Sequence, residues 1–161
     1  TSDTPTINFD FLPTFVEIAG GDPSKMPNEL DGQSILPLLL GEQGDKDRVL
    51  FWYYPHYQIG PAWGAHTLPS ICRPAATIRK GDYKLMEWLE DEKAVELYNL
   101  AEDIGEKTNM APFMPEKVAE LRAELAKWKQ RTNAPDVYPD PDYTPAKFGQ
   151  AKPVPKTAAK K

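Results

Sequence analysis

His56 and His66 are the only side chains here that titrate near neutral pH without perturbation. His56 follows an aromatic run, and His66 lies in a loop rich in glycine and proline. At the end of a rigid strand, His56 could donate a hydrogen bond to an anionic or sugar ligand. The alternative is a histidine stacked in an aromatic cluster at a sheet edge. The residues alone favour stacking, because no serine or cysteine with an activating neighbour is recognisable nearby.

Aromatic residues surround His56 in the sequence: Trp52, Tyr53, Tyr54, Tyr57 and Trp63. Such a group could form a platform on which sugar rings or bases stack. More often a cluster of this kind belongs to a hydrophobic core. Both interpretations stay open from the residues alone.

Other kinds of chemistry find little support. The single cysteine, Cys72, cannot form an intrachain disulfide, and one cysteine with two histidines is too few ligands for a Cys/His zinc site. The acidic run at residues 90–92 lacks the glycine spacing of a calcium loop. No phosphate-binding glycine loop or zinc-protease motif is present. We expect neither a cofactor nor a metal in this chain.

The net charge and the distribution of apolar residues argue against two classes of partner, nucleic acid and membrane. The 161 residues include 19 Lys and Arg against 24 Asp and Glu, a formal net charge of -5. This balance argues against nucleic acid, which needs a basic stripe. No apolar run approaches the roughly 20 residues of a spanning helix, so no membrane is expected as a partner.

The first element to position these residues is a short helix at 10–19, with Phe11, Phe15 and Ile18 at helical spacing. Asp10 could cap this helix, and Gly20 ends it. A single helical turn is expected at 34–40. Strands follow at 49–54, 75–79, 83–89 and 94–100, because these stretches are rich in branched and aromatic residues. Gly81 supplies the positive φ of a tight hairpin, and residues 90–93 make a second hairpin loop.

A second helix is predicted at 115–132, where Val118, Leu121, Leu125 and Trp128 recur every three or four residues. The fold class is therefore α+β, a small four-stranded antiparallel sheet packed by a C-terminal helix. Six of the 17 prolines follow residue 134, so residues 133–161 are expected to form a tail along the surface. The expected divisions are 1–45, 46–132 and 133–161.

An ordered set of motifs resembles the C-terminal region of the type I sulfatases. These are the formylglycine-dependent, arylsulfatase-like enzymes of the alkaline phosphatase superfamily. The matching segments are DFLPTFVEIAG at 10–20, LDGQSILPLL at 30–39, LFWYYPHY at 50–57, ATIRKGDYKL at 76–85, ELYNL at 96–100, DIGE at 103–106, NMA at 109–111 and PDPDY at 139–143. Each motif alone is weak, but their order and spacing are specific.

The resemblance implies that residues 1–45 end the α/β core of a larger sulfatase, and that residues 46–132 form its C-terminal subdomain. Calcium and formylglycine then belong to the full enzyme, in segments outside this chain, and the chain alone should be inactive. The implied partners are the remainder of the catalytic core and a sulfated carbohydrate or aryl sulfate substrate. Relatives are commonly exported, so a periplasmic or secreted location is expected. Because the chain begins at Thr1 without a signal peptide, we expect an excised or processed piece.

In that context His56, Tyr57, Trp63 and His66 are candidate substrate-binding residues, lining one wall of the cleft. Arg79 and Lys84 could meet an anionic sugar, although salt-bridged strand residues are the favoured interpretation. The segment from Cys72 to Ala76 is superficially similar to the family's modification motif C-x-P-x-R, but Ala76 stands where the motif has arginine. Cys72 is therefore expected to be an ordinary thiol, buried or half-buried.

Two alternatives carry no catalysis: a stand-alone module that binds a glycan through the aromatic loop, and a purely structural remnant. If residues 1–45 belong to a larger core, an exposed apolar patch should be left by Phe11, Phe15, Ile18, Leu36 and residues 38–40. If the N-terminal elements fold back on the small sheet instead, that patch should be covered.

Overall fold

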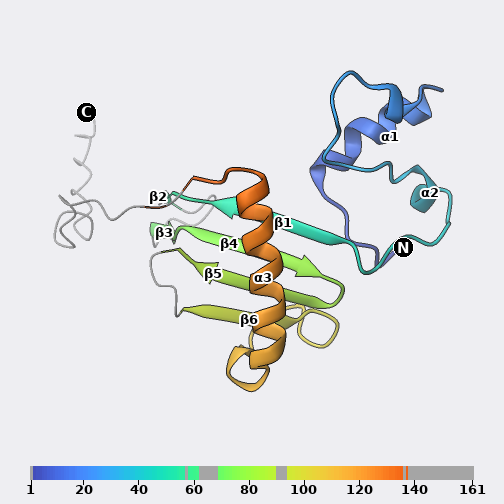
Figure 1. Ribbon diagram of the computed structural model, residues 1–161. Coiled ribbons are helices and arrows are strands. Elements are labelled where there is room, and N and C mark those ends of the chain that lie inside the picture. Colours follow the sequence, from blue (N-terminus) through green and yellow to red (C-terminus); the bar gives the residue numbers. More distant parts are fainter. Residues whose placement is uncertain (1, 57, 62–68, 90–93, 136, 138–161) are drawn as a thin grey trace, which may run out of the picture.

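The computed structural model describes residues 2–56, 58–61, 69–89, 94–135 and 137. A four-stranded antiparallel sheet lies under one long helix, and the N-terminal segment lies beyond the start of the first strand (Figure 1). The sheet consists of β1 (Val49–Tyr54), β4 (Ala75–Lys80), β5 (Tyr83–Trp88) and β6 (Val95–Asn99). The main helices are α1 (Phe11–Ile18), α2 (Leu36–Leu39) and α3 (Pro115–Arg131). These elements confirm the predicted α+β class.

The sheet is a meander in the order β1-β4-β5-β6, and every neighbouring pair is antiparallel. Phe51 pairs with Ile78, Ile78 with Leu85, and Leu85 with Leu97, so one apolar row crosses all four strands. The β4–β5 turn has only two residues, and Gly81 adopts φ +56° there, as predicted. Residues 90–93, where the second hairpin loop was predicted, lie outside the described residues.

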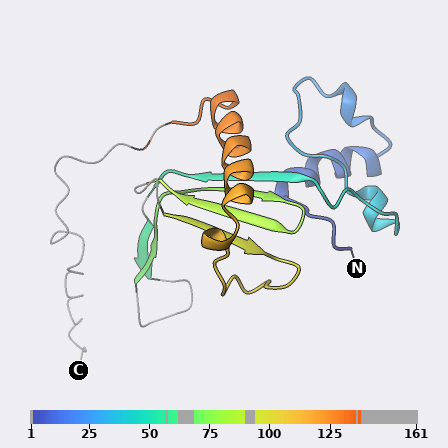
Figure 2. The same cartoon turned by 60° about the horizontal axis from the view of Figure 1, so that its bottom comes forward.

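Helix α3 covers one face of this sheet (Figure 2). Leu121 and Leu125 are fully buried against Ile78, Leu85 and Leu97. Near the end of the helix, the Trp128 ring stacks on Phe51, with centroids 4.9 Å apart and planes 4° apart. The helical spacing of apolar residues at 115–132 therefore predicted both the element and the face that it buries.

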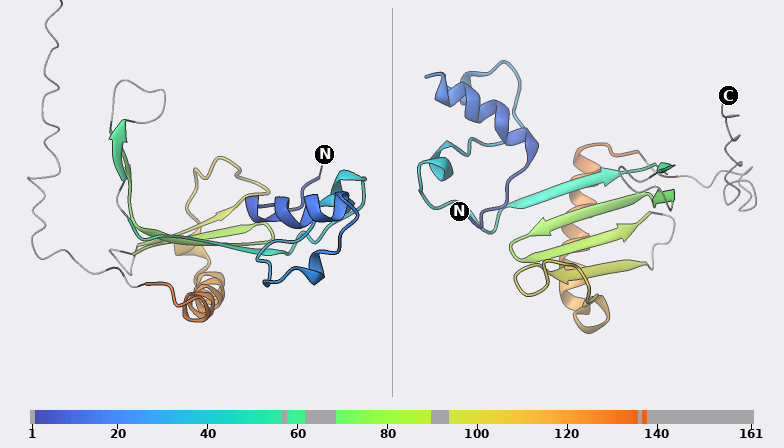
Figure 3. Two further views of the ribbon diagram at one scale, coloured as in Figure 1. Left: turned by 90° about the horizontal axis from the view of Figure 1, so that it is seen from above. Right: turned by 180° about the vertical axis from the view of Figure 1, so that it is seen from behind.

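A further hairpin, β2 (Gln58–Pro61) paired with β3 (Pro69–Cys72), continues the β1–β4 pair and was not predicted. It stands up from the sheet on the side opposite α3, as the left view of Figure 3 shows. Its strands contain glycine and two prolines, residues that strands usually avoid, so no strand pattern was visible. The hairpin is recognised only from the antiparallel pairing of β2 with β3 in the structure.

The N-terminal segment is joined to the sheet through a buried ion pair. Both Asp10 carboxylate oxygens accept from the guanidinium of Arg48, just before β1, at 2.7 Å. The same carboxylate accepts from the backbone N–H groups of Ile7, at 2.8 Å, and Gln33, at 3.1 Å. The expectation that Asp10 caps α1 was wrong, because its side chain makes no capping hydrogen bond there. The carboxylate is instead occupied by a partner 38 residues away.

The apolar side of α1 is not covered by the sheet. Phe11, Phe15 and Ile18 are 53%, 62% and 57% exposed, and Leu39 and Leu40 are more exposed still. The expected apolar patch is therefore exposed at these residues, whereas Leu36 and Leu38, which were also expected in it, are half-buried. The N-terminal elements do not fold back over the exposed part. In the loop before α2, position 32 requires glycine, because a Cβ there would come within 2.1 Å of the Phe9 carbonyl oxygen.

Beyond α3, the chain contacts the end of β1. The hydroxyl of Tyr53 donates a hydrogen bond to the carbonyl oxygen of Pro135. Most of the predicted tail lies outside the described residues. The division into 1–45, 46–132 and 133–161 stays a prediction.

Candidate functional site

His56 lies two residues beyond β1, where the chain turns into the β2–β3 hairpin. Its imidazole is exposed and meets the Tyr54 ring edge to face, with centroids 5.7 Å apart and planes at 89°. This contact is the one expected of a stacked histidine, yet the ring remains accessible to a ligand. Tyr57, Trp63 and His66 lie outside the described residues. The proposed wall of four substrate-binding residues therefore stays a prediction.

The sheet surface opposite α3, here called the open face, carries the other candidates. Strand alternation and register assign these residues to it: Leu50, Trp52, Tyr54, Ala75, Thr77, Arg79, Lys84, Met86, Trp88, Glu96 and Tyr98. The right view of Figure 3 looks onto this face, with α3 behind the sheet. The rings of Trp52 and Tyr54 are 40% and 39% exposed. Unlike the surface under α3, this one is not sealed by a helix.

A hollow of about 410 Å³ lies on the open face. It is lined by Trp52, Thr77, Arg79, Lys84, Leu100, Ile104 and Glu106. The Lys84 ammonium is held by both carboxylate oxygens of Glu106, at 2.7 and 2.8 Å, so the salt-bridged interpretation is correct for Lys84. Arg79 donates from Nε to the carbonyl oxygen of Gly81 at 3.4 Å, but none of the described carboxylates forms an ion pair with it.

A polar cluster on the same face was not predicted. The Glu96 carboxylate accepts from the indole N–H of Trp88 at 3.0 Å and from the hydroxyl of Tyr98 at 2.7 Å. Burial, together with the hydrogen bond to Glu96 and its charge, raises the pKa of Tyr98 to about 12. The Arg73 guanidinium lies over the Trp88 ring, 4.7 Å from its centroid. The alternation of residues along β6 could have predicted that Glu96 and Tyr98 share one face of the sheet. It could not have predicted that they lie beside Trp88.

The residues described do not fit the calcium and formylglycine of the sulfatase resemblance. No group of three or more His, Cys, Asp or Glu among them could hold a metal ion. Cys72 ends β3, and residues 73 and 74 connect it directly to β4, whereas the family's modification motif opens a helix. No reaction step is therefore assigned to either group in this chain. Whether the Cys72 thiol is buried stays a prediction.

The described helices also include none that is long and apolar enough to cross a membrane.

Comparison with known proteins places this fold among sulfatases. The chain is 34% identical over 143 residues to a protein named "Sulfatase" from Formosa agariphila, a match covering 84% of this chain and 24% of that relative. It is 27% identical over 145 residues to the N-acetylglucosamine-6-O-sulfatase of Bacteroides thetaiotaomicron, covering 88% and 24%. One solved structure, described as a complex with its substrate D-glucosamine-2-N,6-O-disulfate, superposes with a TM-score of 0.57 at 24% identity, covering 79% and 25%.

These likenesses define the class: the chain corresponds to the C-terminal region of sulfatases. Residues 1–133 match the family described as "N-sulphoglucosamine sulphohydrolase, C-terminal", and the chain belongs to that family. It spans about a quarter of the length of the curated relatives that it matches.

Proposed function

We propose that this chain is the C-terminal portion of a sulfatase that hydrolyses sulfate esters of carbohydrates, with its catalytic centre outside these residues. The observation that carries the proposal is the family match over residues 1–133. Relatives named for N-acetylglucosamine-6-sulfate and for ulvan support a sulfated saccharide as the substrate. A stand-alone glycan-binding or structural module is not favoured, because the relatives are sulfatases.

The chain would contribute fold stability and one wall of the substrate cleft. His56 is exposed two residues beyond β1, a strand that pairs with β4 over all of its residues. Tyr57, Trp63 and His66 follow it in sequence and would line the same wall. A histidine donor and aromatic rings suit the hydroxyl-bearing faces of a sugar. Calcium and formylglycine would be held by residues outside this chain, and the enzyme would be periplasmic or secreted.

The test is a steady-state assay of the complete gene product. The intact enzyme should release sulfate from sulfated saccharides, and His56→Ala should lower kcat/KM for a sulfated saccharide by about tenfold, the effect of losing one or two hydrogen bonds in a binding site. The same variant should change kcat/KM much less for a small aryl sulfate, which lacks the sugar hydroxyls. Lys127→Ala, exposed on the far side of α3, is the control and should match the wild type.

Two results would contradict the proposal. One is sulfate release by the 161-residue chain alone, which would place the reactive centre within it. The other is a complete protein without activity toward any sulfate ester. An equal loss for saccharide and aryl substrates in His56→Ala would remove His56 from the sugar-binding wall and leave the sulfatase assignment standing.

A further inference from the structure

Two parts of the structure meet at the start of β1: the N-terminal segment, residues 2–39, and the layer formed by the sheet and α3. We propose that the ion pair between Arg48 and Asp10 fixes the angle between these parts, and that Arg48 thereby acts as a positioning residue for His56. This inference rests on the proposed function, which gives His56 its role in binding the saccharide. It adds a specificity-determining residue at the opposite end of β1. The meeting point is called the joint below.

The first argument is that Asp10 is held firmly within the N-terminal segment. Its carboxylate accepts from the backbone N–H groups of Ile7 and Gln33, which lie on either side of α1 in the sequence. One turn further along, the Thr14 hydroxyl donates to the Asp10 carbonyl oxygen at 2.6 Å and accepts from the N–H of Ile35 at 2.9 Å. Asp10 and Thr14 are both buried. These hydrogen bonds hold α1 and the loop before α2 together around the acceptor of the ion pair.

The second argument is the geometry of the link across the joint. The Arg48 guanidinium donates to both Asp10 carboxylate oxygens at 2.7 Å, from a side chain that is only 11% exposed. A two-pronged pair of this kind fixes direction as well as distance. Residues 40–47, which connect the two parts, are mostly exposed, and the ion pair described there joins Lys46 to Asp3 with atoms 3.7 Å apart. An exposed pair adds little, so the angle depends mainly on Arg48.

The third argument is an open cleft beside this ion pair. The cleft has a volume of about 450 Å³, and Arg48 is one of the residues that line it. The N-terminal segment contributes Ile7, Phe9 and Gln33 to its lining, and the sheet and α3 contribute Phe51, Trp128 and Arg131. Side chains that face each other across an open space do not lock two parts by packing, and they leave room for the angle to change.

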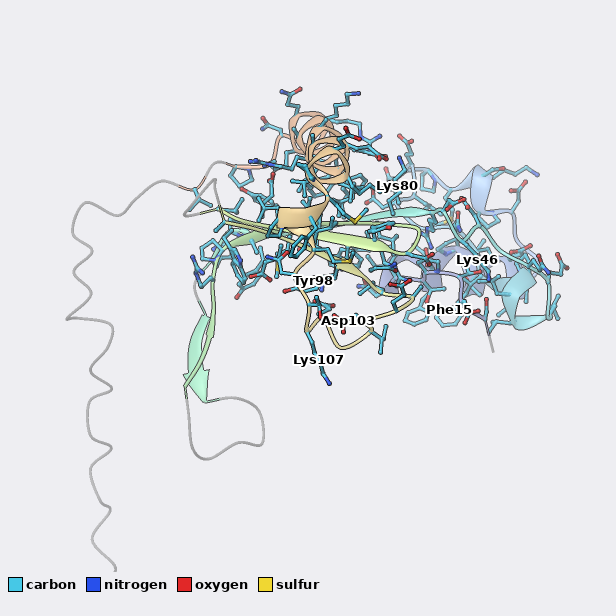
Figure 4. All side chains as sticks on the ribbon, turned by 90° about the horizontal axis from the view of Figure 1, so that it is seen from below. Phe15, Lys46, Lys80, Tyr98, Asp103 and Lys107 are labelled. Carbon is cyan, nitrogen blue, oxygen red and sulfur yellow. The ribbon has the colours of Figure 1, made fainter. Side chains whose placement is uncertain are left out.

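The fourth argument is the length of β1. Arg48 directly precedes this strand, and His56 lies two residues beyond its other end. In Figure 4, Phe15 and Lys46 lie at one end of the sheet and the β2–β3 hairpin lies at the other. At about 3.3 Å per residue, His56 is roughly 25 Å from Arg48, so a tilt of about 5° at the joint moves it by about 2 Å. A shift of that size breaks a hydrogen bond to a substrate that is held by the catalytic core.

The first experiment tests the joint in the 161-residue chain, with its single cysteine removed by Cys72→Ser. Spin labels at Lys25→Cys and Lys127→Cys, both exposed positions, report the distance between the N-terminal segment and α3 in samples diluted with unlabelled chain. Arg48→Lys keeps the charge but replaces the planar guanidinium by a single ammonium, so the distance distribution should become at least about twofold wider. Lys46→Met, at the exposed pair, should leave the width unchanged.

A second pair of labels separates the joint from the fold as a whole. Glu102→Cys and Lys127→Cys both lie on the part formed by the sheet and α3, so Arg48→Lys should not widen their distance distribution. If both distributions widen alike, Arg48 maintains the fold rather than the joint, and the inference is overturned. An unchanged width between positions 25 and 127 would overturn it as well, whether or not the complete protein is a sulfatase.

The second experiment tests the link to His56 in the complete gene product. Arg48→Lys should lower kcat/KM for N-acetylglucosamine-6-sulfate, or for another sulfated saccharide that the enzyme hydrolyses, by about tenfold, mainly through a raised KM. Hydrolysis of 4-nitrophenyl sulfate should stay within about twofold, because it does not use the sugar contact. In a His56→Ala background the same change should cost only about twofold for the saccharide, since the contact that it misplaces is already gone.

The outcomes of the two experiments are distinguishable. Substitutions so far apart normally act independently, so an equal loss from Arg48→Lys with and without His56 would overturn the positioning role. A complete protein that hydrolyses no sulfate ester would contradict the proposed function and the role of Arg48 toward His56. In that case a widened distance distribution in Arg48→Lys would leave the joint itself standing.

Discussion

At the scale of single residues, the structure shows hydrogen-bond and ion-pair partners that the local sequence does not predict. Asp10 looks like a helix cap because it precedes an apolar helical pattern, but its carboxylate pairs with Arg48, 38 residues away. Glu96 follows the acidic run at residues 90–92 in the sequence, yet it is the acceptor for both Trp88 and Tyr98. Such pairings depend on the tertiary fold, and no spacing rule along the chain reveals them. The place of His56 just after β1, by contrast, could be predicted from the recognisable strand that precedes it.

The Asp10–Arg48 pair should contribute strongly to stability at neutral pH. Its side chains are 0% and 11% exposed, so Arg48→Met leaves a buried carboxylate without its counter-charge and should reduce the free energy of unfolding by about 3–5 kcal/mol. Urea titration of the 161-residue chain at pH 7 measures this. The control is Lys46→Met at the exposed Asp3–Lys46 pair, whose atoms are 3.7 Å apart, with an expected loss below about 1 kcal/mol.

The same pair predicts a pH dependence. Burial raises the pKa of Asp10, but the hydrogen bonds from Arg48, Ile7 and Gln33 and the charge of Arg48 outweigh it and hold the pKa below 3.8. A carboxyl whose folded pKa is lowered stabilises the fold above its unfolded pKa and loses that contribution as pH falls through the folded value. The stability difference between wild type and Arg48→Met should therefore shrink below about pH 4. A difference that stays constant from pH 7 to pH 2.5 would contradict this account.

At the scale of elements, the helices and strands that could be predicted are those whose residues follow a regular pattern of helical spacing or a run of branched and aromatic residues. The spacing of Val118, Leu121, Leu125 and Trp128 predicted α3 and its buried side, and branched and aromatic runs predicted all four strands of the sheet. The β2–β3 hairpin could not be predicted, because its prolines and glycine break the strand pattern and its stability comes from pairing. The hydrogen bonds and ion pairs of the open face could not be predicted either. Alternation in β5 and β6 shows that the sheet has a second face, but it does not show which charged side chains on that face are paired.

The junction between α3 and the sheet should be the most sensitive point of the core. Leu125→Ala removes a side chain with no exposure and leaves a cavity against the sheet, so it should cost about 2–5 kcal/mol of unfolding free energy. Leu12→Ala makes the same chemical change at a position that is 50% exposed and should cost less than about 1 kcal/mol. Chemical denaturation of both variants checks the ranking. Equal losses would mean that α3 is not the main cover of the sheet.

At the scale of the whole molecule, the chain has one well-sealed side and one side rich in uncovered apolar groups. Helix α3 seals the first, while the exposed rings of Phe11 and Phe15 stack on each other in α1 with centroids 6.2 Å apart. Contiguous apolar surface of this kind favours association in water. The exposure of these residues followed from the sulfatase resemblance, whereas an isolated domain would be expected to cover them.

The 161-residue chain should therefore self-associate in solution. Multi-angle light scattering at increasing concentration should show species larger than the monomer, and Phe15→Glu should shift the distribution toward the monomer by placing a charge in the patch. Ala126→Glu adds the same charge to the exposed side of α3 and should leave the distribution unchanged. A wild-type chain that is strictly monomeric at all concentrations would contradict this view of the patch.

The meander of the sheet also bears on how quickly this region acquires its structure. Strand β4 pairs with β5, and β5 with β6, which in each case is the next strand along the chain. The β1–β4 pair is continued by the β2–β3 hairpin that connects these two strands, so most contacts join nearby residues. Short loops are entropically cheap to close, and chains with such local contacts pass their folding barrier fast. The sheet and α3 can thus form as an early unit, on which a slower, longer-range assembly of the enzyme can build.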